Sequence, residues 1–474
     1  MKKLLTAAVC AISALTIGLC GCFVSSGLNG VDGVDGKDGR NATAFDYYEL
    51  AKTVPGQENM TVEEFLQKYL SYTKEELEKE FAPQRNANFS LLSAVSILTG
   101  FTCKTRVSGK VYNAVYSGAG VIVDIDKEKG DAYVVTNCHV VYNDDAIDSD
   151  HYICSDVRLY LYGQDTYGVN YKVSSTLVQQ STLNASIYDT QVYGDDDYRI
   201  DAKVVAASIA NDIALLKVTG SEVLKRSSAV AAQFEESDDV YVKEDVYAIG
   251  NPDGDGMTVT SGTVTKESQF IPLNLSEKYA ASEDYFLEYR VIGTDTAING
   301  GNSGGGLFSS KTGKILGIVN SKKAAEEIDN MGYALPGNSV KRLWKLMRDN
   351  FESSGKYAKA TGVDCVVFPA SCAAKSTGAY WDSGKNVAVI EEKVAITSNK
   401  TLSGGNEFKI NDVVTHIKIT DTSGKVVEDR AVTRVYHLGD TLISARAGYT
   451  VEITVLRGAE TKVVTYTATT SKVK

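Results

Sequence analysis

Between about residues 88 and 340 the chain is a succession of short β-rich runs separated by turn residues, and this pattern constrains the fold most strongly. Ala119–Val123 and Ala132–Val135 are two such runs, with Gly, Asn and Asp in the segments between runs. The composition agrees, because 41 glycines and 27 tyrosines against 6 prolines favour tight turns and aromatic strands. The sequence therefore predicts a mostly β fold.

A helical stretch at 338–352 closes this region, since apolar residues recur there on one side of a helix. These residues are Val340, Leu343, Leu346 and Met347. We therefore expect one domain at 88–352. The β-rich runs that resume after a joint containing Gly and Ser predict a second domain at 359–474.

Residues 44–87 predict a short helical arm before the β-rich region. Thr61 with Glu64, and Thr73 with Glu76, have the spacing of a capping box at the first turn of a helix. Nothing in this arm suggests chemistry.

The first 22 residues predict a lipoprotein signal peptide. Lys2 and Lys3 precede an apolar stretch that ends in Leu19-Cys20-Gly21-Cys22, which resembles the bacterial lipobox. The resemblance implies that Cys22 carries the lipid; Cys20 fits less well, because bulky Leu19 would stand at its cleavage position. An uncleaved signal anchor is the alternative. Both interpretations attach the chain to the bacterial membrane outside the cytoplasm, at the cell surface or in the periplasm.

Residues 23–43 contain glycine at every third position from Gly27 to Gly39. We expect a flexible polar spacer, because five triplets without proline are too few to hold a triple helix alone. A collagen-like stalk is the alternative, and it would make the protein a homotrimer.

The chain has a formal net charge of −11 and no Lys/Arg cluster, which argues against a nucleic-acid-binding surface. The cysteines after the N-terminal segment have no zinc-ligand spacing, so we expect no metal and no cofactor. Cys365 and Cys372 are close in sequence and far from the others, so we expect them to form a disulfide. Among Cys103, Cys138 and Cys154 the sequence does not choose.

Three residues of the β-rich region have the types that a serine hydrolase needs. His139 ends an apolar run, Asp212 opens another, and Ser303 lies among glycines. A serine hydroxyl needs an imidazole to take its proton, and a carboxylate fixes the tautomer of that imidazole. A glycine turn around the serine can aim backbone N–H groups at the oxyanion. The order His, Asp, Ser is that of the chymotrypsin clan.

Six ordered segments resemble the HtrA-like proteases of trypsin fold. They are Ser117–Val121, Thr136–Val141, Asp212–Lys217, Ile249–Pro252, Thr294–Gly305 and Gly332–Pro336. The resemblance implies a trypsin-like double β-barrel with the triad His139, Asp212 and Ser303 in the cleft between the barrels. It also implies an oxyanion hole at Gly301, Asn302 and Ser303. The function it implies is endoproteolysis of unfolded or misassembled extracytoplasmic polypeptides.

The chain departs from this family at several positions. Gly300 and Gly306 stand where the family usually has prolines, and Asn302 replaces the aspartate of digestive trypsin-like enzymes. Activation by N-terminal clipping is therefore not expected, and ordering of the loop is the better candidate for control. Cys138 beside the histidine is expected to belong to a disulfide clamp, by analogy with trypsin-like enzymes. The glycine substitutions keep open the alternative of a catalytically weak or dead scaffold that binds peptides at the surface.

The resemblance places the substrate pocket at four residues: Ile298, Val319, Asn320 and Ser321. No aspartate stands at the base of this pocket, so we expect a preference for small or medium apolar side chains. Residues 143–200 make the interval between His139 and Asp212 longer than is typical of the family. We expect a solvated β-hairpin insertion there, with an acidic substrate-steering surface as the alternative.

The C-terminal region resembles a PDZ domain at Phe408–Ile417. The resemblance implies strands at Val387–Val394 and Tyr449–Arg457 and a peptide-facing helix at Asp429–Leu438. The carboxylate loop is not recognisable in the sequence, and Gly362–Cys365 is a candidate for it. A PDZ-like α+β domain would bind the C-terminal peptides of other proteins. A β-rich accessory domain without a ligand is the alternative.

Overall fold

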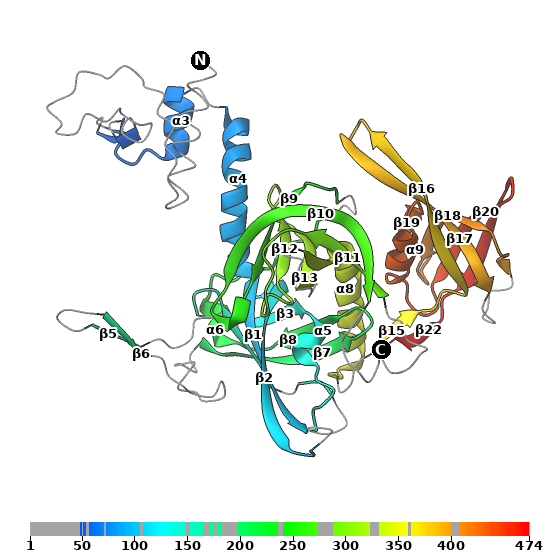
Figure 1. Cartoon of the computed structure of the whole chain (residues 1–474), viewed down its shortest axis with the longest axis horizontal. Helices are drawn as coiled ribbons and strands as arrows, with labels where there is room; N and C mark the ends of the chain where they lie inside the picture. The colour runs from blue at the N-terminus through cyan, green and yellow to red at the C-terminus, as the bar shows by residue number, and fades with distance from the viewer. Residues whose placement is uncertain are drawn as a thin grey trace. The chain divides into compact units, whose positions relative to one another are not determined.

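The computed structural model describes most of the chain after its N-terminal segment (Figure 1). The described residues are 48–49, 51–53, 56–70, 73–104, 108–147, 152–154, 156–164, 170–173, 178–181, 198–235, 240–272, 288–322, 331–358, 362–399 and 407–473. The predictions for the signal peptide, for Cys20 and Cys22 and for the glycine-repeat spacer lie outside these residues. None of the described helices has the length and apolarity that a membrane span requires.

The chain divides into two compact units, Met1–Pro83 and Gln84–Lys474. Helix α3 (Val62–Leu70) begins with the expected capping box. The Thr61 N–H donates to Glu64 Oε2 at 2.8 Å, and the Glu64 N–H donates to Thr61 Oγ1 at 3.2 Å. Helix α4 (Lys74–Ser90) follows, so the helical arm is confirmed over these two helices.

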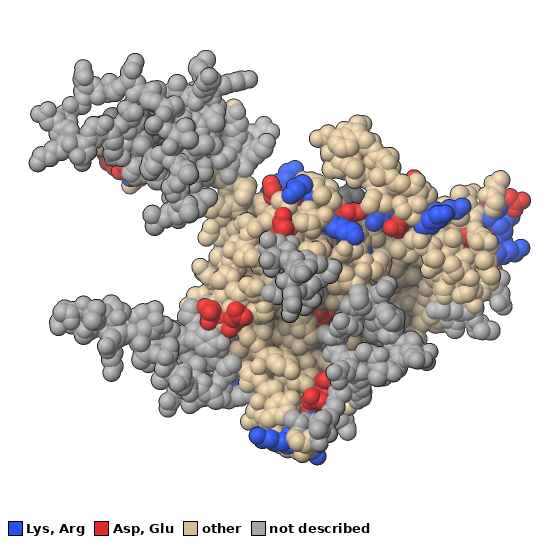
Figure 2. All heavy atoms as spheres, in the orientation of Figure 1, with Lys and Arg blue, Asp and Glu red and all other residues tan. Residues whose placement is uncertain are grey.

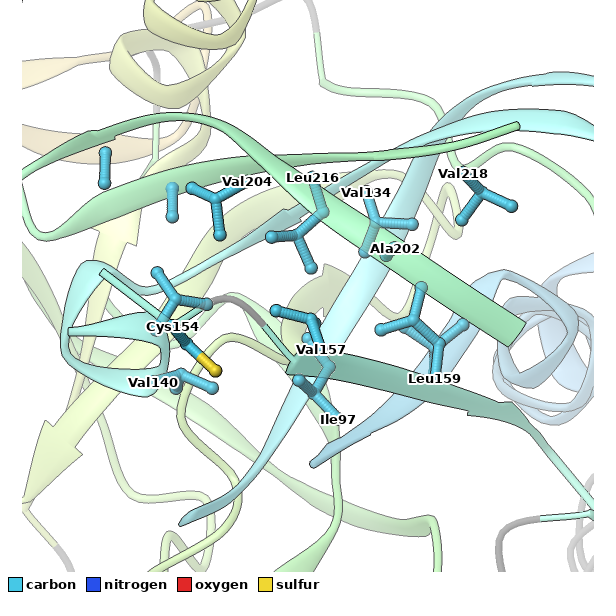
Figure 3. Packing of buried hydrophobic residues seen from close by; sticks show 14 of the residues in the cluster. Ile97, Val134, Val140, Cys154, Val157, Leu159, Ala202, Val204, Leu216 and Val218 are labelled. Atoms are coloured by element: carbon cyan, nitrogen blue, oxygen red, sulfur yellow. The ribbon is translucent and has the colours of Figure 1, made fainter. Parts of the chain in front are cut away.

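The second unit begins with a closed six-stranded barrel, in the order β1-β2-β3-β8-β7-β4. Its strands are β1 (Ala94–Lys104), β2 (Val111–Asp126), β3 (Asp131–Thr136), β4 (Asp156–Leu161), β7 (Ile200–Ser208) and β8 (Ile213–Val218). Figure 3 shows side chains from five of these strands, among them Ile97, Val134 and Leu216, meeting inside the barrel. Branched side chains dominate this interior, which is why β-rich runs close here into a barrel.

A second closed barrel follows, in the order β10-β11-β14-β13-β12-β9. Its strands are β9 (Asp245–Gly250), β10 (Thr258–Pro272), β11 (Glu288–Thr294), β12 (Gly306–Ser309), β13 (Ile315–Lys322) and β14 (Gly332–Pro336). One buried cluster joins Val121 and Leu215 of the first barrel to Ile249 and Phe308 of the second. The double barrel expected from the family resemblance is therefore confirmed.

Helix α8 (Gly337–Ser354) covers this shared core. The four apolar residues expected to share one side of it, Val340, Leu343, Leu346 and Met347, are all buried, as is Trp344. The helix ends at Gly355, whose φ of 65° is left-handed and whose N–H donates to Phe351 O.

The interval 143–200 is only partly an insertion. Strand β4 (Asp156–Leu161) lies within it and pairs with both β1 and β7, so these residues belong to the first barrel and the prediction was wrong for them. In this strand the charged residues Asp156 and Arg158, which form an ion pair at 3.0 Å, alternate with buried apolar residues. The charged residues made the segment resemble a solvated insertion. Beyond it, β5 (Asn170–Val173) and β6 (Val178–Ser181) form an antiparallel hairpin.

The C-terminal region has a separate buried core under a sheet in the order β16-β17-β18-β20-β21, with β19 beside β18. The strands are β16 (Ala370–Asp382), β17 (Val387–Asn399), β18 (Val413–Thr420), β19 (Val426–Ala431), β20 (Thr450–Arg457) and β21 (Glu460–Thr467). The expected strands at Val387–Val394 and Tyr449–Arg457 correspond to β17 and β20.

Two finer expectations for this region were wrong. The segment 429–438 is not one helix: strand β19 ends at Ala431, and helix α9 runs from Val435 to Leu442. Residues 362–365 do not form a loop, because β15 (Val363–Val366) pairs with β22 (Thr470–Val473). Strand pairing overrode the local pattern in both cases, with the neighbouring strand β18 for β19 and with the distant strand β22 for β15.

The expected disulfide does not form, since Cys365 and Cys372 are both free thiols. Cys365 lies on β15 and packs against the core shared by the two barrels, whereas Cys372 lies on β16 and packs against the C-terminal core. Proximity in sequence was therefore misleading. Cys138 is also a free, buried thiol, so the clamp expected beside the histidine is absent from the described structure.

On the face drawn in Figure 2, basic atoms of the described residues are scattered and stand beside acidic ones. No continuous basic stripe crosses the described part of this face.

Candidate active site

His139 lies on the one-turn helix α5 (Cys138–Val141), directly after strand β3. Two buried hydrogen bonds hold this turn in place. Asn137 Nδ2 donates to Asp212 O at 2.9 Å, and Thr99 Oγ1 donates to Val140 O at 2.8 Å. The backbone on each side of His139 is therefore fixed to neighbouring parts of the first barrel.

Asp212 occupies the tight turn between β7 and β8, with a positive φ of 46°. Aspartate tolerates this left-handed region better than most residues, and the Asp212 N–H donates to Ile209 O at 3.1 Å. The turn buries the carboxylate and aims it at the histidine. Asp212 Oδ1 accepts the backbone N–H of His139 at 3.0 Å, and Oδ2 lies 2.8 Å from His139 Nδ1.

A carboxylate only accepts hydrogen bonds, so this contact places the proton of a neutral His139 on Nδ1 and leaves Nε2 as the base. Burial by itself would lower the pKa of His139. The charge of Asp212 and its hydrogen bond outweigh burial and raise the pKa of His139 above its ordinary value.

Ser303 lies in a tight loop before β12. Gly301 and Gly304 have φ values of 92° and 87°, which disfavour any residue with a side chain. The loop is attached to the first barrel, because the Ala119 N–H donates to Ser303 O at 2.8 Å. The Ser303 hydroxyl donates to Asn320 O at 2.9 Å. Among the described residues no hydrogen bond joins this hydroxyl to His139.

Two of the three expected oxyanion donors are free in this loop. Within the described part of the chain, the N–H groups of Gly301 and Ser303 donate to no protein acceptor. The N–H of Asn302 donates to Asn299 O at 3.1 Å, so its assignment to the oxyanion hole is corrected. Free N–H groups on a rigid turn are what a developing oxyanion requires.

The predicted pocket residues separate into different environments. Ile298 and Val319 are both buried in the core of the second barrel, and a methyl group at Gly332 would lie 2.4 Å from Ile298 Cδ1. Ser321 lies on β13, but its side chain is outside the described atoms. The Asn320 carboxamide is directed at Asp212 and Tyr289, so it was misassigned as a pocket wall.

A second buried asparagine was missed. Asn251, which follows β9, donates through Nδ2 to Ser96 Oγ at 2.9 Å and Ser117 Oγ at 3.1 Å. Its Oδ1 accepts the Gly256 N–H at 2.9 Å. Asn251 lies in the segment Ile249–Pro252, which was one of the family-like segments. That segment could have drawn attention to the asparagine, but it does not indicate which residues the side chain contacts.

No group of three or more His, Cys, Asp or Glu residues in the described part of the chain is arranged to hold a metal ion.

Part of the chain matches a known protein domain. Residues 118–318 match the trypsin-like peptidase domain. The chain is 28% identical over 346 residues to the serine protease Do-like HtrA of Bacillus subtilis (strain 168), which covers 73% of this chain and 61% of that protein. It is 31% identical over 280 residues to the periplasmic serine endoprotease DegP of Escherichia coli (strain K12), covering 55% of this chain and 45% of that one.

The solved structure of the HtrA-type protease AlgW with a decapeptide aligns with 82% of this chain and 98% of its own, at 16% identity and a TM-score of 0.45. The chain spans about half the length of the curated relatives it matches.

Proposed function

We propose that this chain, whose residues 118–318 match the trypsin-like peptidase domain, is an HtrA-like serine endopeptidase with Ser303 as the nucleophile. The observation that carries this proposal is the 2.8 Å contact between His139 Nδ1 and buried Asp212, opposite a glycine loop with two free N–H groups. These are the parts that acyl transfer needs: a base, its orienting carboxylate and an oxyanion site.

In the proposed reaction, His139 Nε2 takes the proton of the Ser303 hydroxyl while Oγ attacks the scissile carbonyl carbon. The negative charge moves to the carbonyl oxygen, where the N–H groups of Gly301 and Ser303 stabilise it. The imidazolium then gives its proton to the leaving amine, and the C–N bond breaks to leave an acyl-enzyme. A water molecule, deprotonated by His139, releases the acid and restores the serine.

The serine must turn before it attacks, because its hydroxyl is bonded to Asn320 O in this structure. In the proposed reaction, a rotation about the Cα–Cβ bond of Ser303 redirects the hydroxyl hydrogen bond from Asn320 O to His139 Nε2. The same contact supports the alternative function, a catalytically weak or dead scaffold, if the hydroxyl never leaves Asn320.

Labelling by a fluorophosphonate separates these alternatives, because the reagent reacts only with an activated serine. An endopeptidase is labelled and hydrolyses casein, and both activities disappear in Ser303→Ala. A full chain that neither labels nor cleaves casein at any temperature contradicts the proposal.

For the substrate, we infer unfolded or misassembled extracytoplasmic polypeptides cleaved after small or medium apolar side chains. The preference rests on the sequence, because no aspartate stands at the base of the pocket that the family resemblance implies. Sequencing the products of casein cleavage tests it: predominant cleavage after Lys or Arg would contradict it.

For the C-terminal region, we propose a PDZ-like role in binding the C-terminal peptides of other proteins. Its sheet, with helix α9 beside it, is compatible with strand addition. A fluorescent peptide library with free C-termini should bind the full chain, and its C-terminally amidated counterpart should not. Equal binding of both would favour an accessory domain without this role.

For the N-terminus, we propose a lipid anchor at Cys22 followed by the 23–43 spacer. Metabolic labelling with a fatty acid should mark the wild type and fail in Cys22→Ala. Deletion of residues 23–42 should leave the oligomeric size unchanged if the segment is a spacer, whereas a collagen-like stalk predicts loss of a trimer.

A further inference from the structure

Asn320 stands at the centre of the candidate site, although it is not one of the three triad residues. Its side chain is almost completely buried, at 2% exposure, and its Nδ2 donates to Asp212 Oδ2. Its backbone oxygen accepts the Ser303 hydroxyl at 2.9 Å. One residue thus contacts both the orienting carboxylate and the nucleophile.

The orientation of the Asn320 carboxamide is fixed from its other side. The Tyr289 hydroxyl, on strand β11, donates to Asn320 Oδ1 at 2.8 Å. An amide can be rotated by 180° with little change in shape, so only its partners decide which end faces which group. With Oδ1 held by a hydroxyl donor, the NH2 end must face the carboxylate.

This orientation matters for the dyad of Asp212 and His139. Asp212 accepts three N–H groups: the backbone and Nδ1 of His139, and Nδ2 of Asn320. A flipped amide would place its oxygen against the carboxylate, and the repulsion would displace Asp212 from His139. A charge that is buried needs its hydrogen bonds satisfied, so such a displacement is costly.

We propose that Tyr289 and Asn320 are positioning residues of the triad: the tyrosine hydroxyl locks the carboxamide so that its NH2 group holds Asp212 against His139. The catalytic importance of this arrangement rests on the proposed endopeptidase function. The effect on the dyad itself does not, because it can be observed without substrate.

The test compares Tyr289→Phe, which removes one hydroxyl, with Asn320→Asp, which keeps the shape of the side chain but adds a carboxylate beside Asp212. We expect Tyr289→Phe to slow fluorophosphonate labelling about five-fold, the effect of one neutral hydrogen bond. We expect Asn320→Asp to slow it roughly 10- to 100-fold, since a hydrogen bond to a charged group is lost and a like charge is added.

A second readout does not require activity. The proton on His139 Nδ1 should give a downfield NMR resonance in the full chain, assigned by its absence in His139→Gln. In Tyr289→Phe this resonance should broaden or disappear. The pKa of His139, followed through its ring carbon, should fall, because a displaced Asp212 stabilises the imidazolium less.

Tyr247→Phe is the matched control. Tyr247 is a buried tyrosine of the same barrel, and its hydroxyl forms one hydrogen bond, with Ser90 Oγ at 2.9 Å. The Tyr247→Phe variant should lose a similar amount of free energy of unfolding. It should not alter the His139 resonance, the pKa of His139 or the labelling rate. A similar change of these three readouts in the control would mean that Tyr289 has only a structural role.

The outcomes separate the two proposals. If the wild type labels but Tyr289→Phe leaves the labelling rate, the resonance and the pKa of His139 unchanged, the positioning role is refuted and the endopeptidase stands. If the wild type never labels while Tyr289→Phe still alters the resonance, the proposed enzymatic function fails and the positioning of Asp212 stands.

Discussion

Replacement of Gly301 by alanine tests the oxyanion site most directly. Its φ of 92° lies in the left-handed region, where an L-residue is disfavoured by roughly 1–2 kcal/mol. A Cβ there would lie 2.0 Å from the carbonyl oxygen of Asn251, which is far inside contact distance. The Asn251 backbone cannot retreat easily, because its side chain is bonded to Ser96 and Ser117. The loop must therefore move instead, and the Gly301 N–H moves with it.

The expected loss of activity follows from the proposed role of the Gly301 N–H as an oxyanion donor. Removal of one oxyanion donor slows catalysis by about 10²–10³-fold. We expect Gly301→Ala to lower the rate of fluorophosphonate labelling and of casein cleavage by this order. The free energy of unfolding should fall by roughly 1–2 kcal/mol or more from the φ penalty, as measured by chemical denaturation.

The neighbouring Gly300 supplies the matched control. A Cβ at Gly300 would meet only Asp253 Oδ1, at 3.8 Å, and its φ is not left-handed. Gly300→Ala should therefore leave labelling unchanged and stabilise the fold by about 0.4–1 kcal/mol through the unfolded chain. If Gly301→Ala labels as fast as the wild type, or if both variants are damaged equally, the assignment of the Gly301 N–H to the oxyanion site is wrong.

Three further predictions concern protonation, packing and thiols. Because Asp212 raises the pKa of His139 and the neutral imidazole is the base, activity should fall as the pH drops through that pKa. The acid midpoint of the pH profile should lie above about 6.5; a midpoint below it would contradict the argument. Arg290→Ala removes the 3.1 Å ion-pair partner of Asp440, a carboxylate that is nearly buried. The free energy of unfolding, measured by chemical denaturation, should fall by about 3 kcal/mol, and adding Asp440→Ala should partly restore it. Burial raises the pKa of Cys365 and Cys372 to about 11, so alkylation of the native chain at neutral pH should be slow at both. Alkylation after unfolding without reductant should modify both, whereas a disulfide would protect them.

The parts of the site that the sequence predicted are those held by local backbone geometry. Gly301 and Gly304 require positive φ values, and a serine between such glycines is recognisable from the chain alone. Asp212 directly precedes a buried strand, and His139 directly follows one. Turn chemistry and apolar runs are properties of neighbouring residues, so they can be read without knowing which strands pair.

What the sequence did not reveal depends on contacts between distant segments. Asn320 was assigned to a pocket wall, because nothing near it in the chain indicates that Asp212 and Tyr289 are its partners. The strand at Val363–Val366 was expected to be a loop, because its partner Thr470–Val473 is more than a hundred residues away in the chain. Tertiary pairing decides between two locally acceptable structures in such segments.

In the proposed mechanism the two barrels contribute different catalytic groups, so the position of one barrel relative to the other must be fixed. His139 and Asp212 belong to the first barrel, whereas Ser303 precedes β12 of the second. Asn251 meets this need, because its Nδ2 bonds two serines of the first barrel while its backbone N–H donates to Gly301 O at 3.3 Å.

A hydrogen bond weakens steeply with misalignment, so a small shift between the barrels would break several of these bonds together. The hydrogen bonds of Asn251 therefore depend both on the packing of the two barrels and on the position of the loop that carries Gly301. This explains why a buried asparagine is used where an apolar residue would pack: its directional contacts specify one relative placement, which apolar contacts alone do not.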